Sequence, residues 1–317
     1  MIRIATIGGG PIVRLFVAEL AEVAGLELAG AYSRDPERAA ALAAEFGGPH
    51  SWSSLDALLA DDRVDAVYVA SPNSVHYSQA LAAIEAGKHV LVEKPAVTCA
   101  AEFLTLLEAA ERAGVLVFEG MRNAYDPGTA KLRELLAELG PIRRVSFGYS
   151  QRSSRYDQVL AGERVNIFDP ELGGGALFDL GVYCVSALVD LFGAPDKVLG
   201  VQVPLRSGAD GAGAVLAGYP GFVADLSYSK ITASQRPSEI QGEAATLVID
   251  HIATPRRLEV RTLAGEVRCH EIDQPATNLR YELARFVELV ERQATPEADH
   301  ARTLETLRVL DAIRVAG

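Results

Sequence analysis

Strand-like and helix-like patterns of apolar residues alternate along the first 120 residues. Short continuous apolar runs, typical of buried strands, lie at 2–8, 26–33, 65–72, 89–95 and 115–120. Between them, apolar residues recur three or four positions apart, as on one face of a helix, at 12–23, 35–47, 75–87 and 100–114. Because strand and helix alternate with short connections, the pattern predicts an α/β fold with a doubly wound parallel sheet over residues 1–122.

One of these helices carries clear end signals. Asp35 suits the N-cap, because its carboxylate can accept from the first unpaired backbone N–H groups. Pro36 then takes the first helical position, and Gly47 stands where the helix should stop.

This alternation of strand and helix patterns ends after residue 122. Helical patterns occupy 128–139, 176–193, 279–292 and 303–314. Strand patterns lie at 142–152, 196–205, 222–232, 245–252 and 256–263. Several of these strands follow one another without a helix between them, which predicts an α+β domain with a mostly antiparallel sheet over residues 123–317. The small-residue segment 207–215 is predicted to be a loop.

Composition narrows the class of protein. The net charge of −12, from 30 basic and 42 acidic residues, argues against a nucleic-acid partner, which would need a dense basic patch. No apolar run reaches the length of a membrane span, and the first residues do not resemble a secretory signal. Cys99, Cys184 and Cys269 are odd in number and widely spaced, which predicts a cytoplasmic protein without a metal site.

A glycine cluster follows the first predicted strand and opens the first helix. Gly8 and Gly10 fit the first two glycines of a dinucleotide fingerprint, followed by Pro11 and Ile12. The first glycine allows the tight turn, and the second lets the backbone approach a pyrophosphate at the helix N-terminus. A plain strand-to-helix turn is the alternative, but the surrounding strand–helix–strand pattern favours cofactor binding.

The end of the second strand bears on the choice of cofactor. A carboxylate there would bind the ribose 2′-hydroxyl of NAD(H), but the sequence has Ser33 and Arg34. A guanidinium suits a 2′-phosphate, so these residues favour NADP(H), with NAD(H) still possible. The alternative is that Arg34 is only a surface charge.

The run at 65–72 ends in a polar turn at the carboxyl edge of the predicted sheet. Ser71, Pro72 and Asn73 form this turn, where open α/β folds bind their ligands. His76 follows at the start of the next helix, and we assign it to positioning of the cofactor or of the loop.

The run at 89–95 ends at the same edge. Its apolar residues stop at Glu93 and Lys94, directly before Pro95. Solvated charges at a strand end would be the simple explanation. Because the edge is shared with the turn before His76, we predict that Glu93 and Lys94 contribute to the cofactor site.

Four motifs together resemble the Gfo/Idh/MocA family of NAD(P)-dependent oxidoreductases: "GGGPIV", "SPNSVH", "AGKHVLVEKP" and "LGGGALFDLGVY". The resemblance implies a Rossmann domain followed by a substrate-binding domain whose open sheet often mediates oligomerisation. It also implies that Lys94 is the active-site lysine and that the Lys94–Pro95 bond is often cis.

The last motif supplies a second candidate catalytic group. Asp179 and Tyr183 are four residues apart and share one helix face. A tyrosine here resembles the subgroup of dihydrodiol dehydrogenases, NADP-linked xylose dehydrogenases and glucose-fructose oxidoreductase. By that resemblance Tyr183 is the acid/base, Lys94 favours its phenolate, and Asp179 orients Lys94 or a substrate hydroxyl. A core tyrosine is the alternative.

The sequence departs from this subgroup around the expected pocket. Arg122 and Ala124 replace a frequent Trp and Arg, Tyr125 keeps the outline, and Asn166 stands where Arg is frequent. These changes put a standard xylose or dihydrodiol substrate in doubt. Candidate pocket residues are Arg122, Tyr125, Arg152, Arg155, Tyr156 and Asn166.

The combined prediction is an NADP(H)-preferring dehydrogenase or reductase of a sugar, polyol or related compound. We expect a small-molecule substrate, no nucleic-acid or membrane partner, and a homo-oligomer (dimer or tetramer) formed through the C-terminal sheet. Two alternatives stay open. One is a non-catalytic sensor of the same fold, and the other is an enzyme that cleaves a glycosidic bond through transient oxidation.

Overall fold

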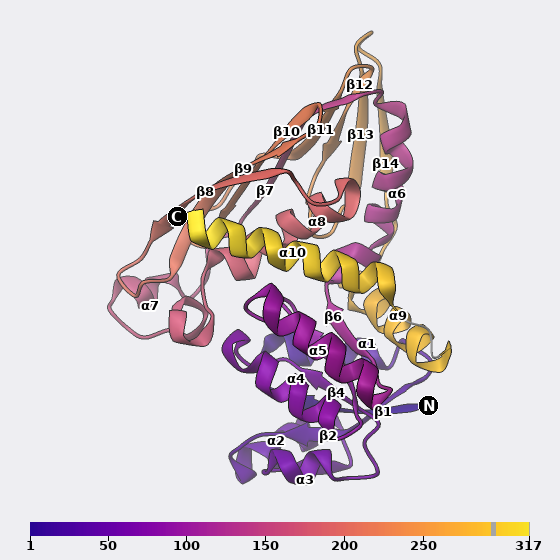
Figure 1. Ribbon diagram of the computed structural model, residues 1–317, viewed down its shortest axis with the longest axis vertical. Coiled ribbons are helices and arrows are strands. Elements are labelled where there is room, and N and C mark those ends of the chain that lie inside the picture. The colour runs from indigo at the N-terminus through magenta and orange to yellow at the C-terminus, as the bar shows by residue number, and fades with distance from the viewer. Residues whose placement is uncertain (293–295, 317) are drawn as a thin grey trace. The chain divides into compact units, whose positions relative to one another are not determined.

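The computed structural model describes residues 1–292 and 296–316 (Figure 1). Internal contacts divide the chain into two compact units. The first contains Met1–Gly120 and Leu279–Ala301, and the second contains Met121–Asn278 and Arg302–Gly317. The expected boundary after residue 122 lies beside the first of these divisions. The segment Leu279–Ala301, expected in the second domain, makes its contacts within the first unit.

The first unit is built on a six-stranded sheet with the order β3-β2-β1-β4-β5-β6. Its strands are β1 (Ile2–Ile7), β2 (Leu26–Tyr32), β3 (His50–Trp52), β4 (Ala66–Val69), β5 (His89–Glu93) and β6 (Val117–Gly120). Every pairing is parallel, which confirms the predicted doubly wound sheet. The strand order reverses between β1 and β4, and this switch point is where such sheets bind ligands.

The helices of the first unit match the predicted segments, except for α3, which was not predicted. They are α1 (Pro11–Leu20), α2 (Pro36–Phe46), α3 (Leu55–Leu59), α4 (His76–Glu85), α5 (Ala100–Ala113) and α9 (Leu279–Arg292). The cap prediction is confirmed, because the Asp35 carboxylate accepts from the N–H groups of Glu37 and Arg38. Gly47 ends α2 in the left-handed conformation, at φ 71°.

The second unit contains an eight-stranded sheet with the order β14-β13-β12-β11-β7-β10-β9-β8. The strands are β7 (Ile142–Ser150), β8 (Lys197–Pro204), β9 (Asp210–Tyr219), β10 (Phe222–Ser229), β11 (Ser238–Gly242), β12 (Ala245–Ile249), β13 (Arg257–Thr262) and β14 (Val267–Glu271). The β7–β10 pair is parallel and the other pairs are antiparallel, which confirms the predicted mostly antiparallel sheet.

The prediction of a loop over 207–215 is wrong, because β9 begins at Asp210. Gly and Ala have weak strand propensity, but β9 pairs with strands on both sides, and tertiary pairing overrides local preference. The glycine at 213 is required for packing. A Cβ added to Gly213 would lie 2.3 Å from the hydroxyl of the buried Tyr228 on β10.

The helices of the second unit include a buried core helix. They are α6 (Pro127–Leu135), α7 (Tyr156–Leu160), α8 (Val182–Phe192) and most of α10 (Glu297–Ala316). Pro170–Phe192 is apolar enough to cross a membrane by composition, but 78% of its most apolar window is buried inside the protein. The residues directly before α8, Leu177–Gly181, form a turn of π-helix. Such turns are frequent at functional sites.

Candidate functional site

The turn between β1 and α1 has the geometry expected of a dinucleotide-binding loop. Gly8 has φ +131°, and a Cβ there would lie 2.4 Å from the carbonyl oxygen of Ala70. Gly10 is the extended N-cap of α1, and an added Cβ would meet nothing within 4 Å. Pro11 follows as the first helical residue, and Ile12 is half-buried. The backbone at the helix N-terminus is therefore open to an approaching ligand.

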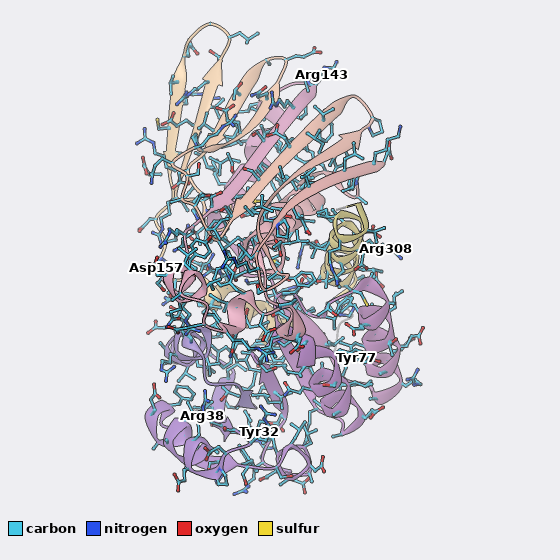
Figure 2. All side chains as sticks on the ribbon, turned by 90° about the vertical axis from the view of Figure 1, so that its left-hand side faces the viewer. Tyr32, Arg38, Tyr77, Arg143, Asp157 and Arg308 are labelled. Atoms are coloured by element: carbon cyan, nitrogen blue, oxygen red, sulfur yellow. The ribbon has the colours of Figure 1, made fainter. Side chains whose placement is uncertain are left out.

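Two arginines border this turn. Arg34 is exposed, two residues beyond the end of β2, and makes no side-chain hydrogen bond or ion pair within the described residues. Ser33 is half-buried, and its N–H donates to the carbonyl of Trp52. Arg38, labelled in Figure 2, lies on α2 with its Nη2 3.5 Å from the position of a Cβ on Gly9. Sequence reasoning missed Arg38, although its spacing of four from Arg34 was an available signal.

His76 connects the turn after β4 to the end of β5. Its Nδ1 lies 3.0 Å from the carbonyl oxygen of Pro95, and its Nε2 lies 2.8 Å from that of Ser71. Burial lowers the pKa of His76 and the charge of Lys94 acts in the same direction, whereas the two carbonyls oppose the shift. The imidazole thus ties two adjacent strand ends together.

The neighbouring residues of this turn have separate environments. The Ser71 hydroxyl donates to Gln79 on α4, over 2.6 Å. Pro72 is exposed, and Asn73 is half-buried at the start of a short 3-10 turn.

The segment after β5 is anchored on both sides of Lys94. Glu93 is buried and accepts a hydrogen bond from the hydroxyl of Tyr68 on β4. The Lys94–Pro95 bond is cis, as the resemblance implies. The N–H of Ala96 donates to the buried carboxylate of Glu119, over 2.9 Å. Lys94 itself is half-buried.

Tyr183 lies in the first turn of α8 within a cluster of aromatic and cationic side chains. The residue is 5% exposed, and its hydroxyl accepts from Nε of Arg122 over 3.1 Å. The Arg122 guanidinium carbon is also 5.5 Å from the centre of the Tyr183 ring. Tyr149 packs 5.7 Å from Tyr183 and 4.6 Å from His251, centre to centre. Arg122 therefore touches the proposed acid/base directly.

Asp179 lies in the π-helical turn before α8 and has a cationic partner of its own. Its carboxylate is 2.7 Å from Nζ of Lys230, which follows β10. Sequence reasoning missed Lys230. Its position directly after an apolar strand was the available signal, since Lys94 has the same placement after β5.

A glycine turn and a buried carboxylate fix the start of this segment. A Cβ on Gly175, at φ +143°, would lie 2.1 Å from Oδ1 of Asp210 on β9. The same carboxylate accepts from the N–H of Leu177 over 2.7 Å. Burial raises the pKa of Asp210, and this hydrogen bond opposes the shift.

The remaining candidate pocket residues have separate environments. The Tyr125 hydroxyl accepts from Arg302, whose guanidinium carbon is 5.0 Å from the Tyr125 ring centre. Arg152 pairs with Asp157 over 2.7 Å and lies over Tyr156. Arg155 and Asn166 are exposed. Of the residues proposed from the departures, the structure brings Arg122 into contact with Tyr183.

A cavity of about 360 Å³ lies beside the last residues of β7. Its lining is mostly polar, with hydroxyl, carboxamide and guanidinium groups from Ser150, Gln151, Ser234, Gln235 and Arg236. Tyr149 and His251 also line it. Because both rings belong to the aromatic cluster around Tyr183, the cavity is next to that cluster.

Comparison with known families identifies the chain. Residues 2–121 match the model described as an oxidoreductase family with an NAD-binding Rossmann fold, and residues 129–248 match the GFO/IDH/MocA C-terminal domain. The chain belongs to the GFO/IDH/MocA oxidoreductase family. The predicted family and enzyme class are therefore confirmed.

Named relatives cover nearly the whole chain. It is 40% identical over 316 residues to scyllo-inositol 2-dehydrogenase (NADP(+)) IolU of Bacillus subtilis, covering 99% of this chain and 96% of that protein. It is 33% identical over 293 residues to D-xylose 1-dehydrogenase (NADP(+)) 2 of Haloferax volcanii, covering 90% and 88%. KijD10, a 3-ketoreductase from Actinomadura kijaniata solved with NADP and TDP-benzene, has TM-score 0.90 and 25% identity, covering 99% and 97%.

The environment of His76 predicts a specific pH dependence of stability. Its pKa is lowered from 6.5 in the folded state, so the unfolded state binds the proton more readily below that pH. The free energy of unfolding should then fall as pH drops below 6.5, by at most about 1.4 kcal/mol per pH unit for this one group.

In His76→Asn this contribution should be absent, so chemical denaturation between pH 7 and 5.5 should show a shallower decline in the free energy of unfolding than in the wild type. Equal slopes for the two proteins would contradict this assignment. The other histidines with lowered pKa values, His89, His251 and His300, are present in both proteins and cancel in the comparison.

Proposed function

We propose that the protein is an NADP(H)-dependent dehydrogenase or reductase of a sugar, polyol or related hydroxy or carbonyl compound. The observation that carries the proposal is the Tyr183 hydroxyl, held by Arg122 in the first turn of the helix that carries the family motif. The relatives named above support the substrate class and the cofactor, because they are NADP(+) dehydrogenases of an inositol and of xylose. We also infer a cytoplasmic location, which the free state of Cys99, Cys184 and Cys269 supports.

The residues of the first unit fit a dinucleotide. The positive φ of Gly8 and the open space at Gly10 leave the N-terminus of α1 accessible to a pyrophosphate. Arg34 and Arg38 are both exposed and lie on the side of the turn where the ribose 2′-phosphate would bind. We assign the 2′-phosphate to these two guanidinium groups, with Ser33 as a further donor.

The chemistry that we propose for the chain is proton transfer. The bound nicotinamide supplies or accepts the hydride. Tyr183 gives its proton to the substrate oxygen in the direction of reduction and takes it back in oxidation. Arg122 donates to the same phenol oxygen and places a permanent positive charge beside it. Lys94 is proposed as the second cation for the reacting oxygen, with Asp179 accepting from a substrate hydroxyl.

The second unit also supports a proposal of self-association. One face of its sheet exposes large apolar side chains on adjacent strands. Leu199 and Val201 on β8 are 67% and 71% exposed, and Leu216 on β9, paired with Leu199, is 58% exposed. Val223 on β10 extends the group at 56% exposed. We propose that this apolar face binds a second copy of the chain, since apolar patches of this kind mark protein–protein contacts.

The cofactor assignment predicts an effect confined to NADP(H). Loss of a charged hydrogen bond to the 2′-phosphate removes about 1.5–3 kcal/mol, or roughly ten- to a hundredfold in affinity. Titration calorimetry should show this loss for NADP⁺ in Arg34→Ala and a larger loss in Arg34→Ala/Arg38→Ala. NAD⁺ affinity should be unchanged. Arg112→Ala, an exposed arginine at the end of α5, is the matched control. Equal losses for both nucleotides would refute the assignment of the 2′-phosphate to these side chains.

The acid/base assignment predicts a loss of turnover without a loss of cofactor binding. Tyr183→Phe should lower kcat by about 10²–10⁴, the usual contribution of a positioned acid/base. Lys94→Ala should also lower kcat, and Tyr183→Phe should bind NADP⁺ with wild-type affinity. Steady-state kinetics on a panel of inositols and aldoses measures the first effect and calorimetry the second. Unchanged turnover in both variants would overturn the mechanism. Tight NADP⁺ binding by the wild type without turnover on the panel would instead favour a sensor.

The self-association proposal predicts a charge-sensitive assembly. Leu199→Asp/Val201→Asp places two carboxylates in the apolar face and should reduce the molar mass in solution by light scattering. Leu263→Asp, at an equally exposed leucine outside this face, should leave the mass unchanged. A wild-type protein that is monomeric at micromolar concentration would disprove the proposal.

A further inference from the structure

The ion pair between Lys230 and Asp179 differs from an ordinary surface salt bridge. The Lys230 side chain is 3% exposed, whereas that of Asp179 is 43% exposed. Nζ of Lys230 is 2.7 Å from the Asp179 carboxylate and donates to the carbonyl of Ile167 over 3.2 Å. It also lies 4.8 Å from the centre of the Phe168 ring. The ammonium is thus enclosed by the protein, and the carboxylate is partly open.

The two partners of this ion pair depend on it to different degrees. A buried ammonium is strongly disfavoured unless a charged partner and hydrogen bonds compensate for its lost hydration. The carbonyl and the aromatic ring supply partial negative charge, and Asp179 supplies a full negative charge. At 43% exposed, the Asp179 side chain keeps part of its carboxylate open to solvent. The buried ammonium therefore fixes the position of the Asp179 carboxylate and favours its charge, while part of that carboxylate stays open to solvent.

The place of Asp179 in the fold adds a second observation. It lies in the π-helical turn Leu177–Gly181, which the Asp210 carboxylate anchors at the N–H of Leu177. Tyr183 follows in the next turn, with Arg122 on its hydroxyl. Two polar groups of one helical segment are therefore each held by a cation from another part of the same unit.

We propose that Lys230 is a positioning residue that holds the Asp179 carboxylate ionised and in one rotamer, as the acceptor for a substrate hydroxyl next to the reacting carbon. This inference rests on the proposed function. It adds a requirement on the substrate, which must carry a hydroxyl neighbouring the carbon that is oxidised or reduced. Because Asp179 already has Lys230 as a partner, a substrate hydroxyl adds a second hydrogen bond to the carboxylate, and simple alcohols and ketones without that hydroxyl should be poor substrates.

The test is a double-mutant cycle on Lys230 and Asp179, measured with the best substrate from a panel of inositols and aldoses. Lys230→Met should raise KM for that substrate by roughly ten- to a hundredfold, the value of a charge-assisted hydrogen bond. It should also move the acidic limb of the kcat/KM profile to higher pH, because a carboxylate without its cation accepts a proton more readily. KM for NADP⁺ should not change.

The cycle separates positioning from general damage. Adding Lys230→Met to Asp179→Asn should change KM less than about twofold, since coupled residues are not additive. Multiplicative effects, or an unchanged pH profile in Lys230→Met, would overturn the proposal. Activity on cyclohexanol, which lacks a neighbouring hydroxyl, should be equally poor in the wild type and in Lys230→Met. Efficient turnover of cyclohexanol by the wild type would also overturn it.

A second variant guards against a folding defect. Lys230→Arg keeps the charge but moves the donor atoms, so KM should rise several-fold while the pH profile stays that of the wild type.

If the wild type binds a polyol in the presence of NADPH but does not turn it over, the proposed function fails. The Lys230 proposal is then tested by calorimetry of polyol binding, in which Lys230→Met and Asp179→Asn should again be non-additive. Additive losses there would refute it.

Discussion

The structure of the first unit depends on one constraint. A parallel sheet that is covered on both faces buries its strands, so only the strand ends can present polar side chains to a ligand. β4 and β5 are buried along their lengths, so their side chains can pack but cannot meet a ligand. The polar residues of this region accordingly collect at the carboxyl ends. There the imidazole of His76 joins the two ends by contacting the carbonyls of Ser71 and Pro95. The candidate cofactor edge is therefore held by polar contacts as well as by hydrophobic packing.

A different rule governs the second unit, where each acidic or phenolic group of the motif helix has its own cation. Arg122 contacts Tyr183, and Lys230 contacts Asp179. In a region of low dielectric constant such contacts are stronger than in water, and an unpartnered charge is correspondingly costly. The arrangement lets Asp179 and Tyr183 lie one turn apart without leaving either group unsupported. Both cations come from segments distant in sequence from the motif, which couples the motif helix to β10 and to the segment after β6.

Sequence patterns predicted the elements whose signals are local and failed where long-range contacts decide. The cap at Asp35 and the helix over 279–292 follow from residue spacing alone, and both are present in the structure. Residues 210–215 were mistaken for part of a loop, because pairing of β9 with β8 and β10 outweighs the weak strand preference of its glycines and alanines. The partner of Lys230 could not be assigned from sequence, since Asp179 lies 51 positions earlier in the chain and the pairing depends on the sheet. Tyr125, predicted to line the pocket, contacts Arg302 of α10, a partner that lies 177 positions later in the chain.

Arg122 departs from the pattern of the resembling subgroup, and its contacts show the chemical consequence of that change. It stands where a Trp is frequent in the resembling subgroup, and the sequence alone suggested only a reshaped pocket. In the structure its guanidinium donates to the phenol oxygen of Tyr183 and lies near the ring. Trp could pack against that ring, but its single N–H carries no charge, whereas Arg brings a permanent charge and several donors. The substitution therefore changes the electrostatic environment of the acid/base as well as the shape around it. Under the proposed mechanism, the phenol oxygen of Tyr183 therefore has a permanent cation within its own unit.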